Sequence, residues 1–253
     1  MKTKTSGHRQ IIAIDAGNTR IKWGLHNGKQ WSKRGWVETG RAAKLEKSIG
    51  TAGKTCDAVV ISNVAGATLR RAIKSALPGM AKVSWIKSAR EQCGVRSSYE
   101  DPAQLGSDRW AALIAARRLF GVSSVVVNAG TALTVDALTE DGVFVGGLIV
   151  PGAELMRKAL ADHTDGLKLQ PGGFTFFPNA TGDAIMSGAV NATCGAIERV
   201  ARFLEDTGQS SPLCVLSGGG AALIEQHLNL PVKVVDNLVL EGLLTIATGD
   251  RTR

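Results

Sequence analysis

A Gly-Ser-Asp-Arg segment in the middle of the sequence has residue types that could activate and hold a small substrate. Ser107 can cap a helix predicted over residues 108–120, which places Asp108 and Arg109 in its first turn. A helix N-terminus stabilises a carboxylate, so Asp108 is expected to be ionised at neutral pH and to accept a proton from a hydroxyl. Arg109 offers a planar fork for a carboxylate. An ordinary first-turn aspartate beside a solvated arginine stays open as the alternative for this segment alone.

Three glycine-containing turns follow predicted strands, and their backbones can approach phosphate groups closely. The first, Asp15-Ala16-Gly17-Asn18-Thr19, lies between strands predicted over 11–14 and 20–25. Asp15 can hold magnesium through water, and Lys22 can supply positive charge. The second is Gly130-Thr131-Ala132, and the third is Ser217-Gly218-Gly219-Gly220 before a helix predicted over 221–228. Their spacing fits neither a Walker loop nor a Rossmann fingerprint, so each turn alone could also be an ordinary hairpin turn.

The elements that must position these turns alternate between strands and helices, which predicts an α/β fold. Helices are predicted over 41–48, 67–77 and 108–120, and strands over 35–38, 56–64, 82–86, 125–127 and 133–137. A strand from 146 turns at Pro151-Gly152 into a helix that runs to 160. Two hairpins with polar glycine turns indicate a duplicated architecture. We predict a disordered basic tail over 1–10 and two lobes over 11–122 and 123–253.

Composition restricts the class of protein. The 253 residues are 44% hydrophobic, which suffices for two modest globular cores, and the longest apolar run is too short to span a membrane. Because the first ten residues are polar and lack a signal-peptide core, we expect a cytoplasmic protein. The charge of +8 is densest in the tails and over 29–54, without a nucleic-acid motif, so we expect no nucleic-acid partner. The four cysteines, Cys56, Cys93, Cys194 and Cys214, have no metal-site spacing and are expected to be free and buried.

The order of four motifs resembles the type III pantothenate kinases. These motifs are residues 15–22, Gly-Ser-Asp-Arg-Trp at 106–110, Gly-Thr-Ala-Leu-Thr-Val-Asp at 130–136 and Gly-Gly-Leu-Ile-Val-Pro-Gly at 146–152. The resemblance runs from about residue 11 to residue 247. It implies two duplicated ribonuclease-H-like lobes of the actin-like, acetate and sugar kinase superfamily. It also implies ATP-dependent phosphorylation of pantothenate to 4′-phosphopantothenate, the first step of coenzyme A biosynthesis.

The same resemblance implies a role for each matched residue. Asp108 matches the proposed general base, and Mg²⁺ would bridge the phosphates of ATP. The substrate-binding positions of the family correspond in this sequence to Tyr99, Gly106, Ser107, Asp108, Arg109 and Thr181. The ATP-binding positions match Asp15, Ala16, Gly17, Asn18, Thr19, Arg20, Ile21, Lys22 and Thr131.

One position departs from the family pattern. Asn128 stands where the family usually has an aspartate that coordinates a monovalent cation such as K⁺ or NH4⁺. An amide keeps a carbonyl oxygen but lacks the charge, so we expect cation affinity to fall.

The family resemblance implies a homodimer through the helix after Gly152 and the helix after Thr181. From the residues alone, the apolar positions of these helices, among them Leu155, Leu160, Met186, Val190 and Cys194, are expected to be ordinary core. Two other functions stay open. One is a kinase of the same superfamily with another small substrate. The other is a basic regulatory or nucleic-acid-binding protein derived from such a kinase.

Overall fold

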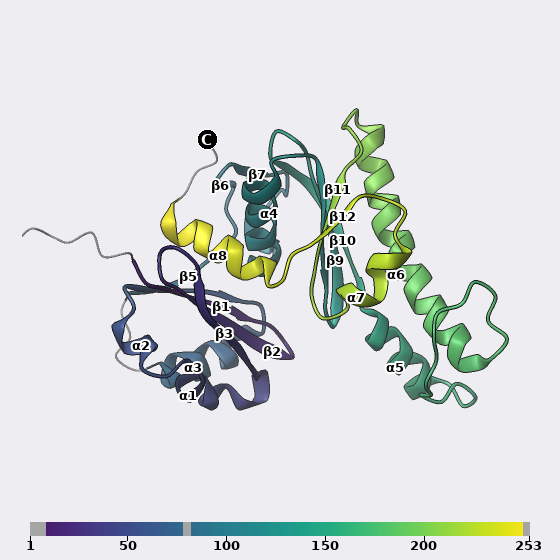
Figure 1. Ribbon diagram of the computed structural model, residues 1–253, viewed down its shortest axis with the longest axis horizontal. Helices are drawn as coiled ribbons and strands as arrows, with labels where there is room; N and C mark the ends of the chain where they lie inside the picture. The colour runs from purple at the N-terminus through teal and green to yellow at the C-terminus, as the bar shows by residue number, and fades with distance from the viewer. Residues whose placement is uncertain (1–8, 78–81, 250–253) are drawn as a thin grey trace, which may run out of the picture. The chain divides into compact units, whose positions relative to one another are not determined.

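The computed structural model describes residues 9–77 and 82–249, so most of the tail predicted over 1–10 lies outside the described residues. Contacts divide the chain into two compact units. Unit 1 comprises Met1–Gly94, Glu100–Arg118 and Leu238–Arg253, and unit 2 comprises Val95–Tyr99 and Leu119–Asn237. Figure 1 shows a sheet with flanking helices in each.

The sheet of unit 1 has the strand order β3-β2-β1-β4-β5. β1, β2 and β3 form an antiparallel meander, and β4 and β5 are parallel to β1. The strands are β1 (Ile11–Ala16), β2 (Arg20–His26), β3 (Trp31–Glu38), β4 (Ala58–Asn63) and β5 (Lys82–Trp85). The short β6 (Glu91–Gln92) follows along the chain and is not a strand of this sheet. The remaining elements are η1 (Thr39–Lys44), α1 (Leu45–Ile49), α2 (Ala52–Thr55), α3 (Gly66–Ala76), η2 (Pro102–Gln104), α4 (Ser107–Phe120) and α8 (Leu238–Thr248).

The sheet of unit 2 repeats this order, with β10-β9-β8-β11-β12 in place of β3-β2-β1-β4-β5. Here β8, β9 and β10 form the antiparallel meander, β11 and β12 are parallel to β8, and β7 pairs with β10. The strands are β7 (Val95–Ser97), β8 (Ser124–Ala129), β9 (Ala132–Leu138), β10 (Val143–Pro151), β11 (Leu213–Ser217) and β12 (Val232–Val234). The helices are α5 (Ala153–His163), α6 (Thr181–Asp206), α7 (Ala221–Ile224) and η3 (Glu225–His227). The predicted α/β fold with two repeated, helix-flanked mixed sheets is confirmed.

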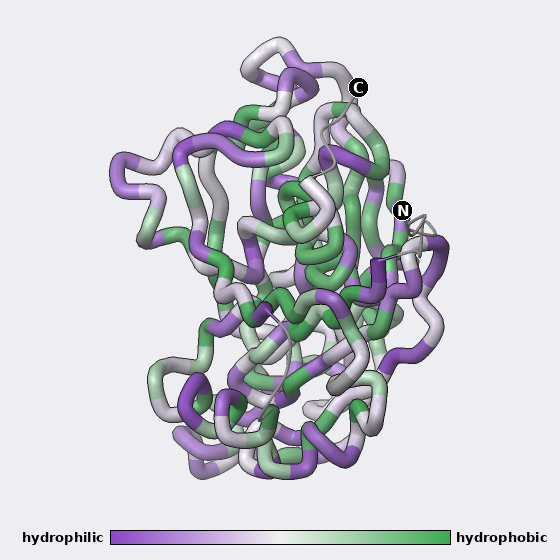
Figure 2. Tube along the Cα trace, turned by 90° about the vertical axis from the view of Figure 1, so that its left-hand side faces the viewer, coloured by the Kyte–Doolittle hydropathy of each residue, from purple (hydrophilic) through white to green (hydrophobic). Residues whose placement is uncertain are grey.

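Each unit has its own apolar core. In unit 1, alternate residues of β1 and β4 pack with Ile73 of α3 and Leu45 of α1, and in unit 2 those of β8 and β9 pack with Val190 and Ile197 of α6. Figure 2 shows the most hydrophobic residues on inner segments of the trace and the most hydrophilic ones largely on outer loops. Parallel central strands need cover on both faces, which accounts for helices on each sheet. Among the described residues, no helix is both long and apolar enough to cross a bilayer.

The C-terminal helix α8 groups with unit 1, whereas the lobes predicted from the sequence assign it to residues 123–253. Its sequence, LVLEGLLTIAT, is almost wholly apolar and needs a hydrophobic surface to cover. It packs on β1 and β4 of unit 1. Gly242 permits close approach to α4, because a Cβ there would lie 1.8 Å from the Ala111 carbonyl oxygen. Tertiary packing of this helix therefore makes the division of the chain discontinuous.

Two expectations about apolar residues have different outcomes. On α6, Val190 and Cys194 are buried, as expected, and Met186 packs at the edge of the core. On α5 the expectation of ordinary core is wrong, because this helix has no buried residue and Leu155 and Leu160 are exposed. The four cysteines are free, and all except the half-buried Cys93 are buried.

Candidate active site

In unit 1, the turn between β1 and β2 places Asp15 opposite Lys22. The two residues are register partners across the antiparallel hairpin, so their side chains share one face of the sheet. The amide of Gly17 donates to the Arg20 carbonyl over 3.1 Å and closes the turn. From outside the hairpin, the Thr39 hydroxyl donates to the Gly17 carbonyl over 2.8 Å. The predicted phosphate turn is therefore braced before any ligand binds.

The side chains of this turn are not equally available to a ligand. Asn18, Thr19 and Arg20 are exposed, and the Arg20 guanidinium lies 4.4 Å from the ring centroid of Trp36. Ala16 and Ile21, by contrast, are fully buried in the core of unit 1. Any contribution of these two residues to ATP binding therefore has to come from the backbone.

The N-terminus of α4 lies beside Asp15 because the two are linked through β4. Ser62 of β4 is the parallel register partner of Asp15, and its hydroxyl is 2.8 Å from that of Ser107, the first residue of α4. The Ser107 hydroxyl thus contacts β4, and the helix begins one residue earlier than predicted. Gly106 fits closely before it, since a Cβ there would lie 2.6 Å from Oδ1 of Asp108.

The Asp108 carboxylate acts electrostatically on Asp15. Burial and the neighbouring Asp108 carboxylate raise the pKa of Asp15 to about 7, although the Lys22 ammonium acts in the opposite direction. Burial also raises the pKa of Asp108, although the backbone N–H of Arg109 and the charge of its side chain act to lower this pKa. The N–H of Arg109 donates to Oδ1 of Asp108 over 2.8 Å. Desolvation of the carboxylate therefore outweighs its stabilisation at the helix N-terminus, and the expectation that Asp108 is ionised at neutral pH stays a prediction.

The remaining predicted substrate residues lie on separate elements. Arg109 is buried in the first turn of α4, with an exposed fraction of 6%. In unit 2, Tyr99 follows β7 and packs on Phe144 of β10, with ring centroids 5.2 Å apart. Thr181 is exposed at the first position of α6. The structure thus joins Asp108 and Arg109 on one helical turn, while Tyr99 and Thr181 occupy different parts of unit 2.

In unit 2, the predicted glycine turns pack against one another at one end of the sheet. A Cβ on Gly152 would lie 2.1 Å from the Gly130 carbonyl oxygen, and the Gly152 amide donates to the Thr131 carbonyl over 2.8 Å. Gly218 has φ +103°, and a Cβ there would lie 2.4 Å from the Ala129 carbonyl oxygen. These glycines are needed so that three backbone turns can touch, and they leave Thr131 exposed at the tip.

Comparison with known proteins decides the family. A family model of type III pantothenate kinase matches residues 11–202. A type III pantothenate kinase from Nitrosospira multiformis is 48% identical over 238 residues, which cover 94% of this chain and 90% of the relative. Another type III pantothenate kinase, from Aromatoleum aromaticum, is 47% identical over 241 residues, which cover 95% of this chain and 98% of that relative. The chain belongs to the type III pantothenate kinase family. The predicted family and the prediction of an enzyme are confirmed.

A solved structure agrees with the sugar-kinase-like fold. A putative 2-dehydro-3-deoxygalactonokinase from Sinorhizobium meliloti superposes with a TM-score of 0.60 at 16% identity, covering 94% of this chain and 98% of that one. At this identity the likeness concerns the fold alone.

Asn128, the departure from the pantothenate kinase pattern, is the last residue but one of β8, next to the glycine turns. It is the register partner of Thr134 on β9 and of Ser217 on β11, and its side chain is partly exposed. All three side chains offer oxygen atoms without charge. Within the described residues, no group of three His, Cys, Asp or Glu side chains is placed to hold a metal ion. Mg²⁺ in kinase sites is commonly held by one or two carboxylates together with substrate phosphates, and Asp15 and Asp108 fit that donor set.

Sequence reasoning missed two residues that organise the site. Ser62 tethers α4, and its signal was the pair Ser62-Asn63 that directly follows a run of buried β-branched residues. Thr39 braces the β1–β2 turn although it lies 20 residues after Thr19 in the sequence. Its amide also donates a hydrogen bond to the Thr19 carbonyl over 3.1 Å. A single threonine after a strand carries no signal for such a contact.

Proposed function

We propose that Asp108 is the general base in a reaction that transfers the γ-phosphate of ATP to the primary hydroxyl of pantothenate. Family membership establishes the phosphorylation of pantothenate in coenzyme A biosynthesis and the use of ATP, and the roles of individual residues are our proposal. One observation carries it. Asp108 stands at the tethered N-terminus of α4 beside Asp15, with its pKa raised by burial. A raised carboxylate pKa brings a base closer to the working pH and strengthens its pull on a hydroxyl proton.

The two turns divide the handling of ATP between side chains and backbone. We assign residues 15–22 and Thr131 to the phosphates, with Lys22 supplying charge and the N–H group of Asn18 as a donor. Asp15 would hold Mg²⁺ through water, and the bound ion would lower the negative charge that the nucleophile approaches. The brace from Thr39 keeps the turn in place, so little ordering is required when ATP binds.

For pantothenate, we assign the carboxylate to Arg109 and the rest of the molecule to the other predicted substrate positions. An arginine with an exposed fraction of 6% loses little side-chain freedom when it pairs with a carboxylate. The other positions are Tyr99, Gly106, Ser107 and Thr181. The proton that Asp108 takes from the hydroxyl stays on its carboxyl oxygen until the product leaves.

A monovalent cation site at Asn128 is retained in weakened form. K⁺ or NH4⁺ would meet only neutral oxygen ligands from the side chain of Asn128 and its neighbours, so we propose that turnover does not require either ion.

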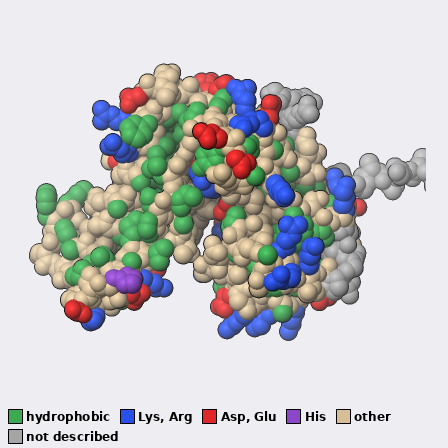
Figure 3. Space-filling view, turned by 180° about the vertical axis from the view of Figure 1, so that it is seen from behind, with side chains coloured by type: hydrophobic (Ala, Val, Ile, Leu, Met, Phe, Trp, Pro, Cys, Tyr) green, Lys and Arg blue, Asp and Glu red, His purple; other side chains and the backbone are tan. Residues whose placement is uncertain are grey.

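We also propose that the chain is a cytoplasmic homodimer without a nucleic-acid partner. Leu155 and Leu160 of α5 are exposed, as are Phe176 and Phe177, and Figure 3 shows hydrophobic side chains gathered on the part of unit 2 that bears α5 and α6. Exposed apolar residues that gather in this way commonly mark a protein interface. The four free thiols suit a reducing compartment. In unit 1, three of the basic side chains, Arg20, Lys33 and Arg34, already stack on tryptophans.

The testing experiment measures phosphate transfer from ATP to pantothenate by the purified chain with Mg²⁺, in parallel Na⁺, K⁺ and NH4⁺ buffers. We expect turnover in all three, and we expect Asn128→Asp to become faster with K⁺ than with Na⁺. Absence of turnover in every buffer would overturn the assigned function. Turnover of the unaltered chain with K⁺ or NH4⁺ alone would overturn only the proposal about Asn128.

A further inference from the structure

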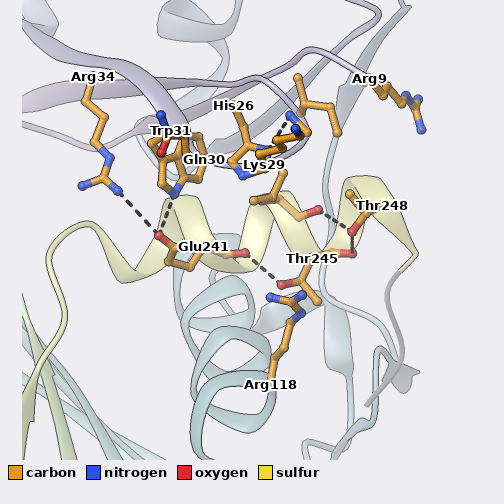
Figure 4. A pocket seen from close by; sticks show the side chains of 13 residues that line it. Arg9, His26, Lys29, Gln30, Trp31, Arg34, Arg118, Glu241, Thr245 and Thr248 are labelled. Carbon is orange, nitrogen blue, oxygen red and sulfur yellow. Dashed lines mark hydrogen bonds and ion pairs between the residues drawn. The ribbon is translucent and has the colours of Figure 1, made fainter. Parts of the chain in front are cut away.

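Unit 1 contains a second concave site away from the two aspartates. A cavity of about 760 Å³ lies between the β2–β3 hairpin, the beginning of β1, helix α8 and the end of α4. Figure 4 shows the side chains that line the cavity, which come from these four segments. This volume matches sites that hold small molecules.

The two ends of unit 1 separate this cavity from the proposed catalytic residues. The cavity is lined by Ile11 at the beginning of β1, whereas Asp15 is four residues along the strand, a separation of roughly 13 Å. Arg118 lines it near the end of α4, and Asp108 is ten residues back along that helix, roughly 15 Å. The cavity is therefore a different site, which shares its two supporting elements with the catalytic one.

The lining of the cavity is strongly basic. It includes Arg9, Lys29, Arg34 and Arg118, and its only carboxylate is that of Glu241. The Glu241 carboxylate accepts a hydrogen bond from Nε1 of Trp31 over 2.7 Å and lies 3.9 Å from the Arg34 guanidinium. A concave surface lined by charges of one sign concentrates ions of the opposite sign.

Neutral donors and a fixed wall complete the site. The Gly28 amide donates to Nδ1 of His26 over 3.1 Å, and burial lowers the pKa of this histidine, so the neutral ring carries its proton on Nε2 as a donor. The Trp31 ring rests on Gly24, where a Cβ would lie 2.8 Å from it, and the ring of His26 meets it edge-on at 5.2 Å. With its N–H bound to Glu241, this indole is a rigid wall of the cavity.

We propose that this cavity binds a small polyanion that carries phosphate or carboxylate groups. The charges of four cationic side chains exceed that of one carboxylate, and three of the four are arginines whose planar forks match such groups. The site is independent of the proposed reaction, because none of its lining residues takes part in it.

The test follows the indole N–H signals of the five tryptophans by NMR in Mg²⁺-free buffer of constant ionic strength, with Trp31→Phe identifying the Trp31 signal. Inorganic pyrophosphate and citrate are titrated separately, so that the two arms distinguish phosphate from carboxylate recognition. We expect at least one of them to shift the Trp31 signal with a saturating curve. The double variant Lys29→Gln/Arg118→Gln should weaken binding at least tenfold, while its turnover of pantothenate stays unchanged.

Two controls keep the result specific. Lys74→Gln removes an exposed charge from α3 on the same unit and should leave the titration unchanged. Asp15→Asn alters the catalytic end and should also leave it unchanged. No shift of the Trp31 signal with either anion up to millimolar concentration would overturn the proposal, and so would equal weakening in the Lys74→Gln variant. Arg34→Gln is a second cavity variant if the double variant fails to fold.

Discussion

The β1–β2 turn of unit 1 and the β8–β9 turn of unit 2 occupy the same place in two sheets of the same strand order. Asp15-Ala16-Gly17 corresponds to Asn128-Ala129-Gly130. Lys22 and Ser62 are the register partners of Asp15, whereas Thr134 and Ser217 are those of Asn128. Unit 1 thus has two ionisable side chains where unit 2 has an amide and a hydroxyl. A second carboxylate, that of Asp108, adds to the charge of the first turn only.

The two turns also differ in what holds them. In unit 1 the hydroxyls of Thr39 and Ser62 supply the contacts, and in unit 2 the glycines of neighbouring turns pack backbone against backbone. A repeated scaffold therefore supports two kinds of site. One turn carries charged or ionisable side chains, for which we propose a role in the chemistry, and the other has a close-packed backbone, for which we propose a role in nucleotide binding. The predictions below test this division, beginning with the largest expected effect.

Asp108→Asn should lower kcat by about 10²- to 10⁴-fold, because the amide keeps the position but cannot take the hydroxyl proton. The thermal unfolding midpoint and ATP affinity should change little, and calorimetric titration with ATP measures the latter. A variant with a near-normal rate would remove Asp108 as the base.

Arg109→Ala should raise the KM for pantothenate about 10- to 100-fold, which is the loss expected when a charged hydrogen-bonding partner of a carboxylate is removed. Arg109→Lys should recover part of the affinity, since the charge returns without the planar fork. Because Arg109 is buried, unfolding midpoints of both variants are measured alongside. Unchanged KM in a folded Arg109→Ala variant would contradict the assignment to the carboxylate.

Gly152→Ala should destabilise unit 2 by about 1–3 kcal/mol, because a Cβ 2.1 Å from the Gly130 carbonyl oxygen forces the turns apart. Denaturant unfolding measures the change. Gly195→Ala in α6 is the matched control, since no atom lies within 4 Å of its added Cβ and alanine favours a helix. Equal stability of the two variants would show that the turns are not held by close packing.

The pH dependence of stability should differ between Asp15→Asn and the unaltered chain. Because the pKa of Asp15 is raised to about 7 from 3.8, the folded chain binds this proton more tightly than the unfolded chain. Its contribution to stability is therefore greatest at low pH and is lost as pH rises from about 4 to 7. The variant lacks this loss, so its stability relative to the unaltered chain should increase between pH 5 and 8. If the unfolding midpoints of the variant and the unaltered chain, measured without nucleotide, change in parallel across that range, the raised pKa is contradicted.

The sequence alone determined most of the repeated fold, and it predicted a set of site residues. Strand–turn–strand patterns around Gly17 and Gly130 are local, since β-branched runs and glycine turns act over a few residues, and both hairpins formed where predicted. The four motifs in their order were sufficient to predict the family.

Tertiary structure decided what depends on residues far apart in the chain. The direction of the Asp108 pKa follows from burial, which no local pattern measures, and the contacts of Ser62 and Thr39 join separate segments. The apolar spacing of α5 predicted core, yet the same spacing suits a face that remains exposed in the monomer. The membership of α8 in unit 1 and the basic cavity beside it likewise depend on packing between segments more than 200 residues apart, such as Trp31 and Glu241. Local sequence sets which elements form, and only their packing sets which charges are desolvated and which surfaces meet.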